Sequence, residues 1–281
     1  MVAKCNLFYY RVGWLDTQGS GHEHTGLHRA AICRPGRHRH RGGSGIGAAT
    51  AHRFAEEGAT VVIAGRTLDK LAKVAADARG DVRTRQVDVT DRVAVRQLID
   101  EVAAEHGKLN VLVNNAGTDS PGDVTRTSDD DWARVLQTNL DAVFYGCRAA
   151  MPHLLASGGC IVNVSSVSGL GGDWDNVAYN AAKGGVVNLT RALAMDHAAD
   201  GVRVNAVAPS LTVTDMTGGI TGNEDVMARF RERIPLGRPA QPSEVAAAIT
   251  FLASADASFI TGVNLPVDGG LGASNGQPRL S

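Results

Sequence analysis

The chain has 281 residues, a formal net charge of −1, 43% hydrophobic residues and 20% charged residues. This balance is ordinary for a globular protein, and the length suits one large domain or two small ones. The near-neutral charge gives no sign of a nucleic-acid partner, and no apolar run is long enough to cross a membrane. The N-terminus lacks the apolar core of a signal peptide, so we expect a cytoplasmic protein. The cysteines share no metal-type spacing and are expected to be free thiols: Cys5, Cys33, Cys147 and Cys160.

The first segment of interest is RPGRHRHRGGSGIGAAT, residues 34–50, which joins two unlike halves. From Ser44 onward it is typical of a glycine turn that opens a helix, and such a turn should follow a buried strand. The preceding half instead holds four arginines and two histidines. Buried charges without partners cost several kcal/mol each. We therefore expect residues 1–41 to be an anomalous head that is disordered or outside the sheet. Arg41 stands where the first turn glycine belongs, so we also expect weak cofactor binding.

The genetic code suggests an origin for this head. One allowed codon choice for Ile32–Arg41, read from its second base, encodes Phe-Ala-Gly-Arg-Val-Ala-Ile-Val-Thr-Gly, an apolar strand and turn in register with Ser44. We hypothesise that residues up to about 42 are read in the wrong frame. Sequencing of the encoding DNA tests this hypothesis. If no single-base offset upstream of Gly42 encodes an apolar strand, the hypothesis is wrong. The head also contains several possible metal ligands: His22, Glu23, His24, His28, His38 and His40. Their spacing defines neither a coordination geometry nor a complete set of ligands, so no metal site is predicted.

After the glycine turn, helical and strand patterns alternate along the chain. Helices are predicted over residues 48–57, 68–79, 93–106, 131–156, 177–198 and 243–253, the last capped by Ser243 with Glu244 in its first turn. Strands are predicted over residues 59–65, 82–89, 109–117, 159–166, 202–209 and 262–270. This alternation indicates a single-domain, Rossmann-like α/β fold, with a doubly wound parallel sheet of about seven strands flanked by helices. We place this domain at residues 42–270, followed by a tail at 271–281.

Ligands of such folds bind beyond the carboxyl ends of the strands. The SGIG turn alone is a weak signal, but at a helix N-terminus it can hold a pyrophosphate. About 20 residues further on, the residue that reads the adenine ribose is Arg66, after Gly65. A guanidinium can bind a 2′-phosphate with two parallel bonds, which favours NADP over NAD. The alternative is an exposed loop arginine with no role in the cofactor site.

The pattern YNAAK places Tyr179 and Lys183 on one face of a predicted helix. An ammonium beside a phenol is expected to lower the pKa of the phenol from about 10, so that Tyr179 exchanges a proton with a carbonyl or alcohol oxygen. Ser166 ends the preceding strand and can face the same pocket. Taken alone, Tyr-x-x-x-Lys is a chance pattern, but a serine at the strand end and a nucleotide turn upstream favour the catalytic interpretation.

Over about residues 42–270 the chain resembles the short-chain dehydrogenase/reductase family. The motifs that carry the resemblance, in family order and spacing, are NNAG (114–117), IVNVSS (161–166), YNAAK (179–183), VRVNAVAP (202–209) and VDGG (267–270). The resemblance implies reversible hydride transfer between nicotinamide and a carbonyl carbon, with Tyr179 as acid or base. It also implies that Lys183 holds the nicotinamide ribose, that Ser166 orients the carbonyl oxygen and that Asn139 holds a water that relays protons.

The resemblance implies a cofactor site as well. Its expected members are Ser44, Gly45, Ile46, Gly47, Arg66, Asp88, Val89, Asn115, Ala116, Gly117, Tyr179, Lys183, Pro209 and Thr214. It further suggests a homotetramer packed through the two long helices, at about 131–156 and 177–198.

The substrate is less constrained, because substrate loops vary most. The segments SVSGLGGDW (166–174) and APSLTVTDMT (208–217) and the tail resemble acetoin reductases, also called 2,3-butanediol dehydrogenases. A small ketone or secondary alcohol is therefore expected, in a compact pocket that Leu170 and Trp174 could line; simple loop packing is the alternative for these two. A 3-oxoacyl-thioester reductase is the second candidate. Such an enzyme would need a basic patch near the pocket mouth to bind its carrier protein. The nearby candidates are Arg229, Arg231 and Arg233, but a solvent-exposed helix face is the better interpretation of these arginines. The third candidate function is not enzymatic: a relative that binds the nucleotide without turnover.

Overall fold

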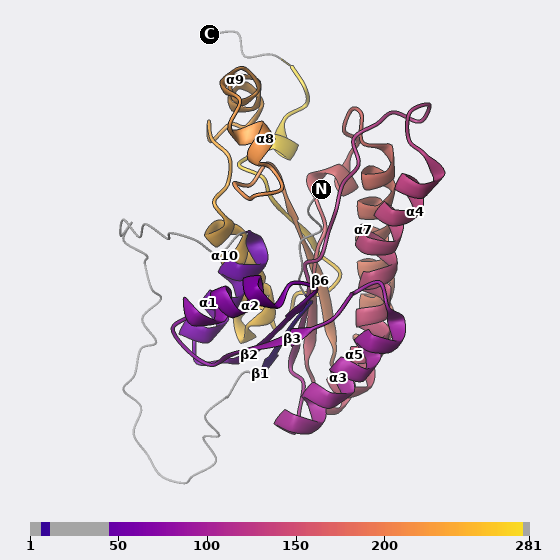
Figure 1. Ribbon diagram of the computed structural model, residues 1–281, viewed down its shortest axis with the longest axis vertical. Helices are drawn as coiled ribbons and strands as arrows, with labels where there is room; N and C mark the ends of the chain where they lie inside the picture. The colour runs from indigo at the N-terminus through magenta and orange to yellow at the C-terminus, as the bar shows by residue number, and fades with distance from the viewer. Residues whose placement is uncertain (1–6, 12–44, 278–281) are drawn as a thin grey trace.

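The computed structural model describes residues 7–11 and 45–277 of the chain. In these ranges one sheet lies between two layers of helices (Figure 1). The strand order is β3-β2-β1-β4-β5-β6-β7. The strands are β1 (Leu7–Arg11), β2 (Thr60–Gly65), β3 (Val82–Gln86), β4 (Val111–Asn114), β5 (Cys160–Val164), β6 (Arg203–Pro209) and β7 (Asn264–Val267). This arrangement confirms the Rossmann-like α/β class.

Helices cover both faces of the sheet, as the alternating pattern predicts (Figure 1). One face packs against α3 (Arg92–His106), α5 (Ala142–Ser157) and α7 (Val177–His197), and the other against α1 (Ile46–Glu56), α2 (Leu68–Ala76) and α10 (Pro242–Ala253). The shorter elements are α4 (Asp129–Leu136), η1 (Gln137–Asp141), α6 (Val167–Leu170), α8 (Gly218–Thr221), α9 (Glu224–Arg233), η2 (Ala255–Ala257) and η3 (Leu271–Ala273).

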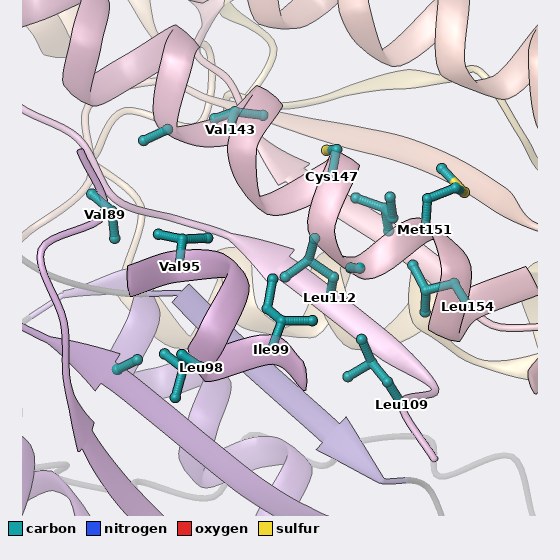
Figure 2. Close-up of a cluster of buried hydrophobic side chains, with 14 of the residues drawn as sticks. Val89, Val95, Leu98, Ile99, Leu109, Leu112, Val143, Cys147, Met151 and Leu154 are labelled. Carbon is teal, nitrogen blue, oxygen red and sulfur yellow. The ribbon is translucent and has the colours of Figure 1, made fainter. Parts of the chain in front are cut away.

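The core consists of one apolar cluster on each face of the sheet. On the α3–α5 side, Leu112 of β4 packs between Ile99 of α3 and Cys147 of α5, all fully buried (Figure 2). Strands β4 and β5 are buried along their whole length, which explains why they are largely apolar rather than alternating. Their two polar residues satisfy each other, because Asn114 Nδ2 donates to Asn163 Oδ1 at 2.9 Å. The rigid centre of the sheet therefore fixes where the strand ends, and the polar residues on them, lie.

One strand departs from the predicted parallel sheet. β1 runs antiparallel to both of its neighbours, so that Leu7 pairs with Ala64 of β2 and with Asn114 of β4. The expectation that the whole head lies outside the sheet is therefore wrong for residues 7–11. Without a strand in this position, the facing edges of β2 and β4 would leave rows of backbone N–H and C=O groups unpaired. An aromatic-rich segment, LFYYR, can pair with both edges in either direction.

Two helix predictions also need correction. The single helix predicted over residues 131–156 is two helices, α4 and α5, joined by the π-helical turn η1 that holds Asn139. The last helix begins one residue earlier than predicted, at Pro242, so Ser243 is not its cap. Instead Gln241 precedes the helix, and its backbone N–H donates to the Glu244 carboxylate at 2.7 Å. Proline suits the first helical position because its missing N–H has no intrahelical partner there.

Candidate active site

A pocket opens at the carboxyl ends of the parallel strands, where β5 and β6 and the N-terminus of α1 converge. It is lined by Gly45, Ile46, Gly47, Asn115, Gly117, Val164, Ser165, Ser166, Tyr179, Lys183, Pro209, Ser210, Thr212, Thr214, Met216 and Thr217. Most residues singled out in the sequence therefore come together in one place, although they are far apart along the chain.

Ser166 stands at the end of β5 and serves as the N-cap of the short helix α6. Its hydroxyl oxygen accepts the backbone N–H of Ser168 at 3.1 Å, as cap residues do. The side chain is 8% exposed, so its hydroxyl lies in a largely desolvated part of the pocket wall.

Tyr179 and Lys183 lie one turn apart on α7, with the Lys183 ammonium 5.6 Å from the centre of the Tyr179 ring. Lys183 is only 3% exposed, and its Nζ donates to the backbone carbonyl of Val164 at 2.7 Å. The ammonium thus lies against the end of β5, beside Ser165 and Ser166.

The pKa values of this pair differ from the expectation. Burial raises the pKa of Tyr179 to about 12, while a hydrogen bond with Ser166 acts in the opposite direction and the charges of Asp119 and Asp173 add to the rise. Burial lowers the pKa of Lys183 to about 8. The predicted lowering of the Tyr179 pKa by Lys183 is therefore wrong for this structure, because the ammonium faces the ring and the Val164 carbonyl, and the loss of hydration dominates.

Asn139 in η1 is fully buried beneath the turn that follows β4. Its Nδ2 donates to the carbonyls of Thr118 (2.7 Å) and Val135 (2.9 Å), and its Oδ1 accepts the Thr118 N–H at 3.2 Å. A Cβ at Gly117 would be 2.9 Å from Asn139 Oδ1 and 3.9 Å from Lys183 Nζ. The Asn139 amide and the Lys183 ammonium therefore both lie close to the space that a side chain at Gly117 would fill.

The turn before α1 and the loop after β6 form the opposite wall of the pocket. Gly45 has φ +100°, a conformation that side chains rarely adopt, and a Cβ there would be 3.8 Å from Thr214 Cγ2. Thr217 holds the loop after β6, since its hydroxyl donates to the Thr212 carbonyl at 2.6 Å and accepts the Thr214 N–H at 3.0 Å. Several lining residues were not predicted as members of the site: Val164, Ser165, Ser210, Thr212, Met216 and Thr217. Most of them belong to the segment 208–217, but no sequence pattern shows which loop side chains face a pocket.

Arg66 and Asp88 meet at the ends of β2 and β3, with Nη1 3.8 Å from Oδ2 and both side chains about half exposed. Neither lines the pocket described above. Val89 and Ala116 are buried in the apolar core behind it, so their side chains support the site from beneath.

Leu170 and Trp174 do not form the compact apolar wall considered for them. Leu170 is 43% exposed and Trp174 is 90% exposed, and neither lines the pocket. The short helix α6 and the loop after it turn these side chains outward. The solvated helix face expected for the arginines of α9 is confirmed, because Arg229 and Arg233 are exposed and Arg231 pairs with Glu224.

Several sequence predictions lie outside the described residues: Ser44, the reading-frame segment, Cys5, Cys33 and the histidines at positions 22 to 40. In the part of the chain that the structure covers, no group of three or more His, Cys, Asp or Glu residues could hold a metal ion. Cys147 and Cys160, both within that part, are free and buried. Among the described helices, none combines the length and apolar character that a membrane span requires.

Gly169 is the contact point between α6 and α7, and it gives a testable packing prediction. A Cβ at Gly169 would lie 2.5 Å from the Lys183 carbonyl oxygen and 2.8 Å from Ser165 Oγ, so Gly169→Ala must push α6 away from α7. We expect a loss of about 1–3 kcal/mol in unfolding free energy together with lower activity, because Ser166 is the N-cap of α6 and would move with it. Gly171→Ala is the matched control, since a Cβ there meets nothing within 4 Å. Equal denaturation midpoints for the two variants would contradict the prediction.

With this geometry, the molecule has the fold and the polar strand ends of a nicotinamide-dependent oxidoreductase. A family model described as enoyl-(acyl carrier protein) reductase matches residues 42–272. The chain belongs to the short-chain dehydrogenase/reductase family, and it is accordingly an NAD(P)-dependent oxidoreductase that acts on secondary alcohols and their ketones.

Three relatives illustrate the range of the family. The chain is 52% identical over 239 residues to the meso-2,3-butanediol dehydrogenase of Serratia marcescens, covering 85% of this chain and 94% of that protein. It is 40% identical over 232 residues to a 3-oxoacyl-[acyl-carrier-protein] reductase of Thermotoga maritima, covering 81% and 94%. The crystal structure of a gluconate 5-dehydrogenase from Burkholderia cenocepacia, in complex with NADP and tartrate, superimposes with a TM-score of 0.79 at 35% identity, over 83% of this chain and 92% of that one.

The pocket fits a nicotinamide cofactor. Two glycines give backbone access, at Gly45 before α1 and at Gly117 beside Asn139 and Lys183. The buried Lys183 ammonium supplies hydrogen-bond donors beyond the one it directs at Val164. A helix N-terminus, a glycine-lined floor and a buried cation suit a polyanionic ligand with ribose hydroxyls.

Proposed function

We propose that this protein interconverts small secondary alcohols and ketones, with vicinal diols and hydroxyketones of the acetoin and 2,3-butanediol type as its substrates. The observation that carries the proposal is the convergence of Ser166, Tyr179 and Lys183 on one pocket with the N-terminus of α1. The relative in Serratia marcescens is named for a diol of this type, which supports the substrate class.

In the proposed mechanism, the bound cofactor supplies or accepts the hydride at its nicotinamide ring. Tyr179 gives its proton to the ketone oxygen in reduction and takes the alcohol proton in oxidation. Ser166 holds the same oxygen, Lys183 binds the nicotinamide ribose, and Asn139 holds a water that passes protons from solvent to Lys183. These roles suit the positions of the four side chains around Gly117 and the end of β5.

The proposed cofactor site extends along the carboxyl edge of the sheet. The segment 44–47 would hold the pyrophosphate, and Pro209 and Thr214 would lie against the nicotinamide half. Asp88 and Val89 would flank the adenine, and Asn115, Ala116 and Gly117 would lie under the ribose. In support of this assignment, Gly45 and Thr214 approach each other across the pocket.

NADP is the proposed cofactor, because Arg66 lies at the end of β2 where the adenine ribose is read. Its ion pair with Asp88 is half exposed and holds the guanidinium weakly, so the guanidinium can turn to a 2′-phosphate. We expect Arg66→Gln to raise the KM for NADPH about 10- to 100-fold, with little change for NADH. Arg96→Gln, on the exposed face of α3, is the control. Faster turnover of the unmodified protein with NADH than with NADPH would refute the preference.

One assay separates the candidate functions. Absorbance of NADPH and NADH is followed with diacetyl, acetoin and an acetoacetyl thioester as substrates. Turnover of diacetyl or acetoin supports the proposal, whereas activity with the thioester alone favours the 3-oxoacyl-thioester reductase, which the relative in Thermotoga maritima exemplifies. No activity, after the head is replaced by an apolar strand ending in Thr-Gly, favours a nucleotide-binding relative without turnover.

Three further parts of the proposal concern the chain as a whole. Residues 42–270 form the oxidoreductase domain, residues 1–41 are a head of altered reading frame, and residues 271–281 are a tail; DNA sequencing tests the head. We also propose a homotetramer whose subunits pack against one another through α4, α5 and α7. The partly exposed side chains of Trp132 and Phe144 on these helices support it, and analytical ultracentrifugation tests the oligomeric state. Free Cys147 and Cys160 suit the reducing cytoplasm, which cell fractionation tests.

A further inference from the structure

The pocket wall carries more hydroxyl groups than the proposed mechanism uses. Ser166 and Tyr179 are assigned to the reacting oxygen of the substrate. Five further residues with a hydroxyl line the same pocket: Ser165, Ser210, Thr212, Thr214 and Thr217. A hydroxyl that already bonds the protein stabilises the pocket wall, whereas a hydroxyl without a partner remains available to a ligand. The hydrogen bonds of these five side chains therefore separate structural groups from groups that recognise a substrate.

Four of the five hydroxyls form hydrogen bonds within the protein. Ser165 Oγ donates to a backbone carbonyl of α7 at 3.1 Å, and Thr212 Oγ1 donates to the Ser210 carbonyl at 3.0 Å. The Thr217 hydroxyl donates to the Thr212 carbonyl at 2.6 Å, and Thr214 Oγ1 lies 3.2 Å from Thr217 Oγ1. These four side chains hold the end of β5 against α7 and stabilise the loop after β6.

Ser210 is the exception among these five residues. No other residue in the described part of the chain forms a hydrogen bond with its hydroxyl, although Ser210 is partly buried in the pocket wall. Its backbone is held on both sides, because the N–H donates to the Val267 carbonyl at 3.3 Å and the carbonyl accepts the Thr212 hydroxyl. A ligand in the pocket can therefore bond the Ser210 hydroxyl without a rearrangement of the main chain, which keeps the cost of binding low.

Ser210 and Ser166 lie at the ends of neighbouring strands. Ser166 follows β5 by two residues, and Ser210 directly follows β6. The two strands pair in parallel with Val164 opposite Val207, and the Ser165 N–H extends this pairing by donating to the Val207 carbonyl at 2.9 Å. Neighbouring strands are about 4.8 Å apart, and each residue advances a strand by about 3.3 Å. By this register the two serines are within one residue of the same level, which puts both hydroxyls within reach of one small molecule in the pocket.

We infer that Ser210 is a specificity-determining residue, which binds the second oxygen of a vicinal diol or hydroxyketone while Ser166 and Tyr179 hold the reacting oxygen. The non-reacting oxygen of a diol or of acetoin is a hydroxyl, and a serine hydroxyl can donate to it or accept from it. A simple alcohol or ketone lacks this oxygen and leaves Ser210 without a partner. This inference rests on the proposed function, because it assumes that the reacting oxygen lies at Ser166 and Tyr179.

The kinetic test compares acetoin with 2-butanone, which has the same carbon chain without the second oxygen. Both are reduced by the unmodified protein and by Ser210→Ala, with NADPH at saturation. We expect Ser210→Ala to lower kcat/KM for acetoin about threefold to tenfold, because one hydrogen bond to the substrate is lost. The value for 2-butanone should stay within about twofold, since this ketone makes no such bond.

Ser258→Ala is the matched control, because it makes the same chemical change on an exposed residue outside the pocket lining. It should change neither value. A loss for 2-butanone as large as the loss for acetoin, or no loss for acetoin, would overturn the inference. So would a rise in the KM for NADPH in place of these changes, because Ser210 would then contact the cofactor rather than the substrate.

A second measurement needs no turnover. NADPH and an alcohol are both in the reduced form and cannot react, so calorimetry can measure the binding of 2,3-butanediol and of 2-butanol to the full chain saturated with NADPH. We expect the preference for the diol over 2-butanol to fall about threefold to tenfold in Ser210→Ala. An unchanged preference would refute the role of Ser210. If acetoin is not reduced, the proposed substrate class fails, and this measurement still decides whether Ser210 recognises a second oxygen.

Discussion

Tyr179→Phe is expected to lower the turnover number for ketone reduction about 100- to 10,000-fold, because it removes the proposed proton donor and little else. The aliphatic hydroxyls of the pocket wall, Ser166 among them, cannot replace it, because serine and threonine are far weaker acids than a phenol. Lys183 cannot replace it either, because its ammonium is buried against the Val164 carbonyl. The ring of Phe keeps the packing against the cluster that contains Val135 of α4 and Ala182, so the fold should survive.

The pH dependence of the reaction rate provides a second test of the role of Tyr179. Burial raises the pKa of Tyr179 to about 12, so the neutral phenol is the form present near pH 7 and is ready to act as an acid in reduction. Alcohol oxidation requires the deprotonated form, so its rate should climb about tenfold per pH unit on the acid side of the apparent pKa. Tyr179→Phe should lose this climb together with the activity.

Tyr145→Phe is the matched control, since it deletes the same hydroxyl from a ring on α5 that packs beside Phe144 and Arg148. It lies outside the pocket lining, and its turnover should stay within about twofold of the unmodified protein, as for most substitutions away from a site. Retention of a tenth or more of the reductase activity in Tyr179→Phe, with an unchanged melting temperature, would remove Tyr179 from the proposed role.

The spacing of residues along the chain was enough to predict the main layers and the heart of the site. Tyr179 and Lys183 are one helical turn apart wherever the segment is helical, and Ser166 follows a strand that is buried throughout. The parallel sheet then brings strand ends together at one edge. These inferences need only local patterns and the rule that neighbouring parallel strands end on the same side.

What the sequence could not show depends on non-local pairing and on loop geometry. The direction of β1 depends on its backbone hydrogen bonds to β2 and β4, and these two strands lie far from β1 along the chain. The π-helical turn at Asn139 leaves no mark in the hydrophobic period, because one inserted residue barely disturbs it. Exposed Trp174 and pocket-lining Met216 both belong to loops, where no periodicity orients a side chain.

Lys183→Met is expected to have opposite effects on activity and on stability. Lys183 is 3% exposed, and among the described residues its ammonium has one hydrogen-bond acceptor, the Val164 carbonyl. Burial lowers its pKa from 10.5 to about 8, so folding disfavours the charged form. Replacement by Met, which has a similar length and no charge, removes this penalty. Activity should fall at least about 100-fold, because the proposed ribose anchor and its proton path are lost.

The sign of the stability effect follows from proton linkage. Between pH 8 and pH 10.5 the unfolded lysine binds more protons than the folded one, so the stability of the unmodified protein rises with pH across this window, by up to about 3 kcal/mol. Lys183→Met lacks this rise. The difference in unfolding free energy between Lys183→Met and the unmodified protein should therefore be largest below pH 8 and smaller at pH 9.5. Tyr179, with a pKa of about 12, does not titrate in this window.

Denaturant unfolding at pH 7 and pH 9.5, at one protein concentration, measures this difference. Lys73→Met on α2 makes the same chemical change on an exposed side chain, and any pH dependence that it shows is subtracted. A Lys183→Met variant that is less stable than the unmodified protein by the same amount at both pH values would mean that the ammonium is well solvated in the folded state. A variant with the expected pH dependence and little activity would show that the fold keeps a buried charge at a cost in stability, as functional sites commonly do.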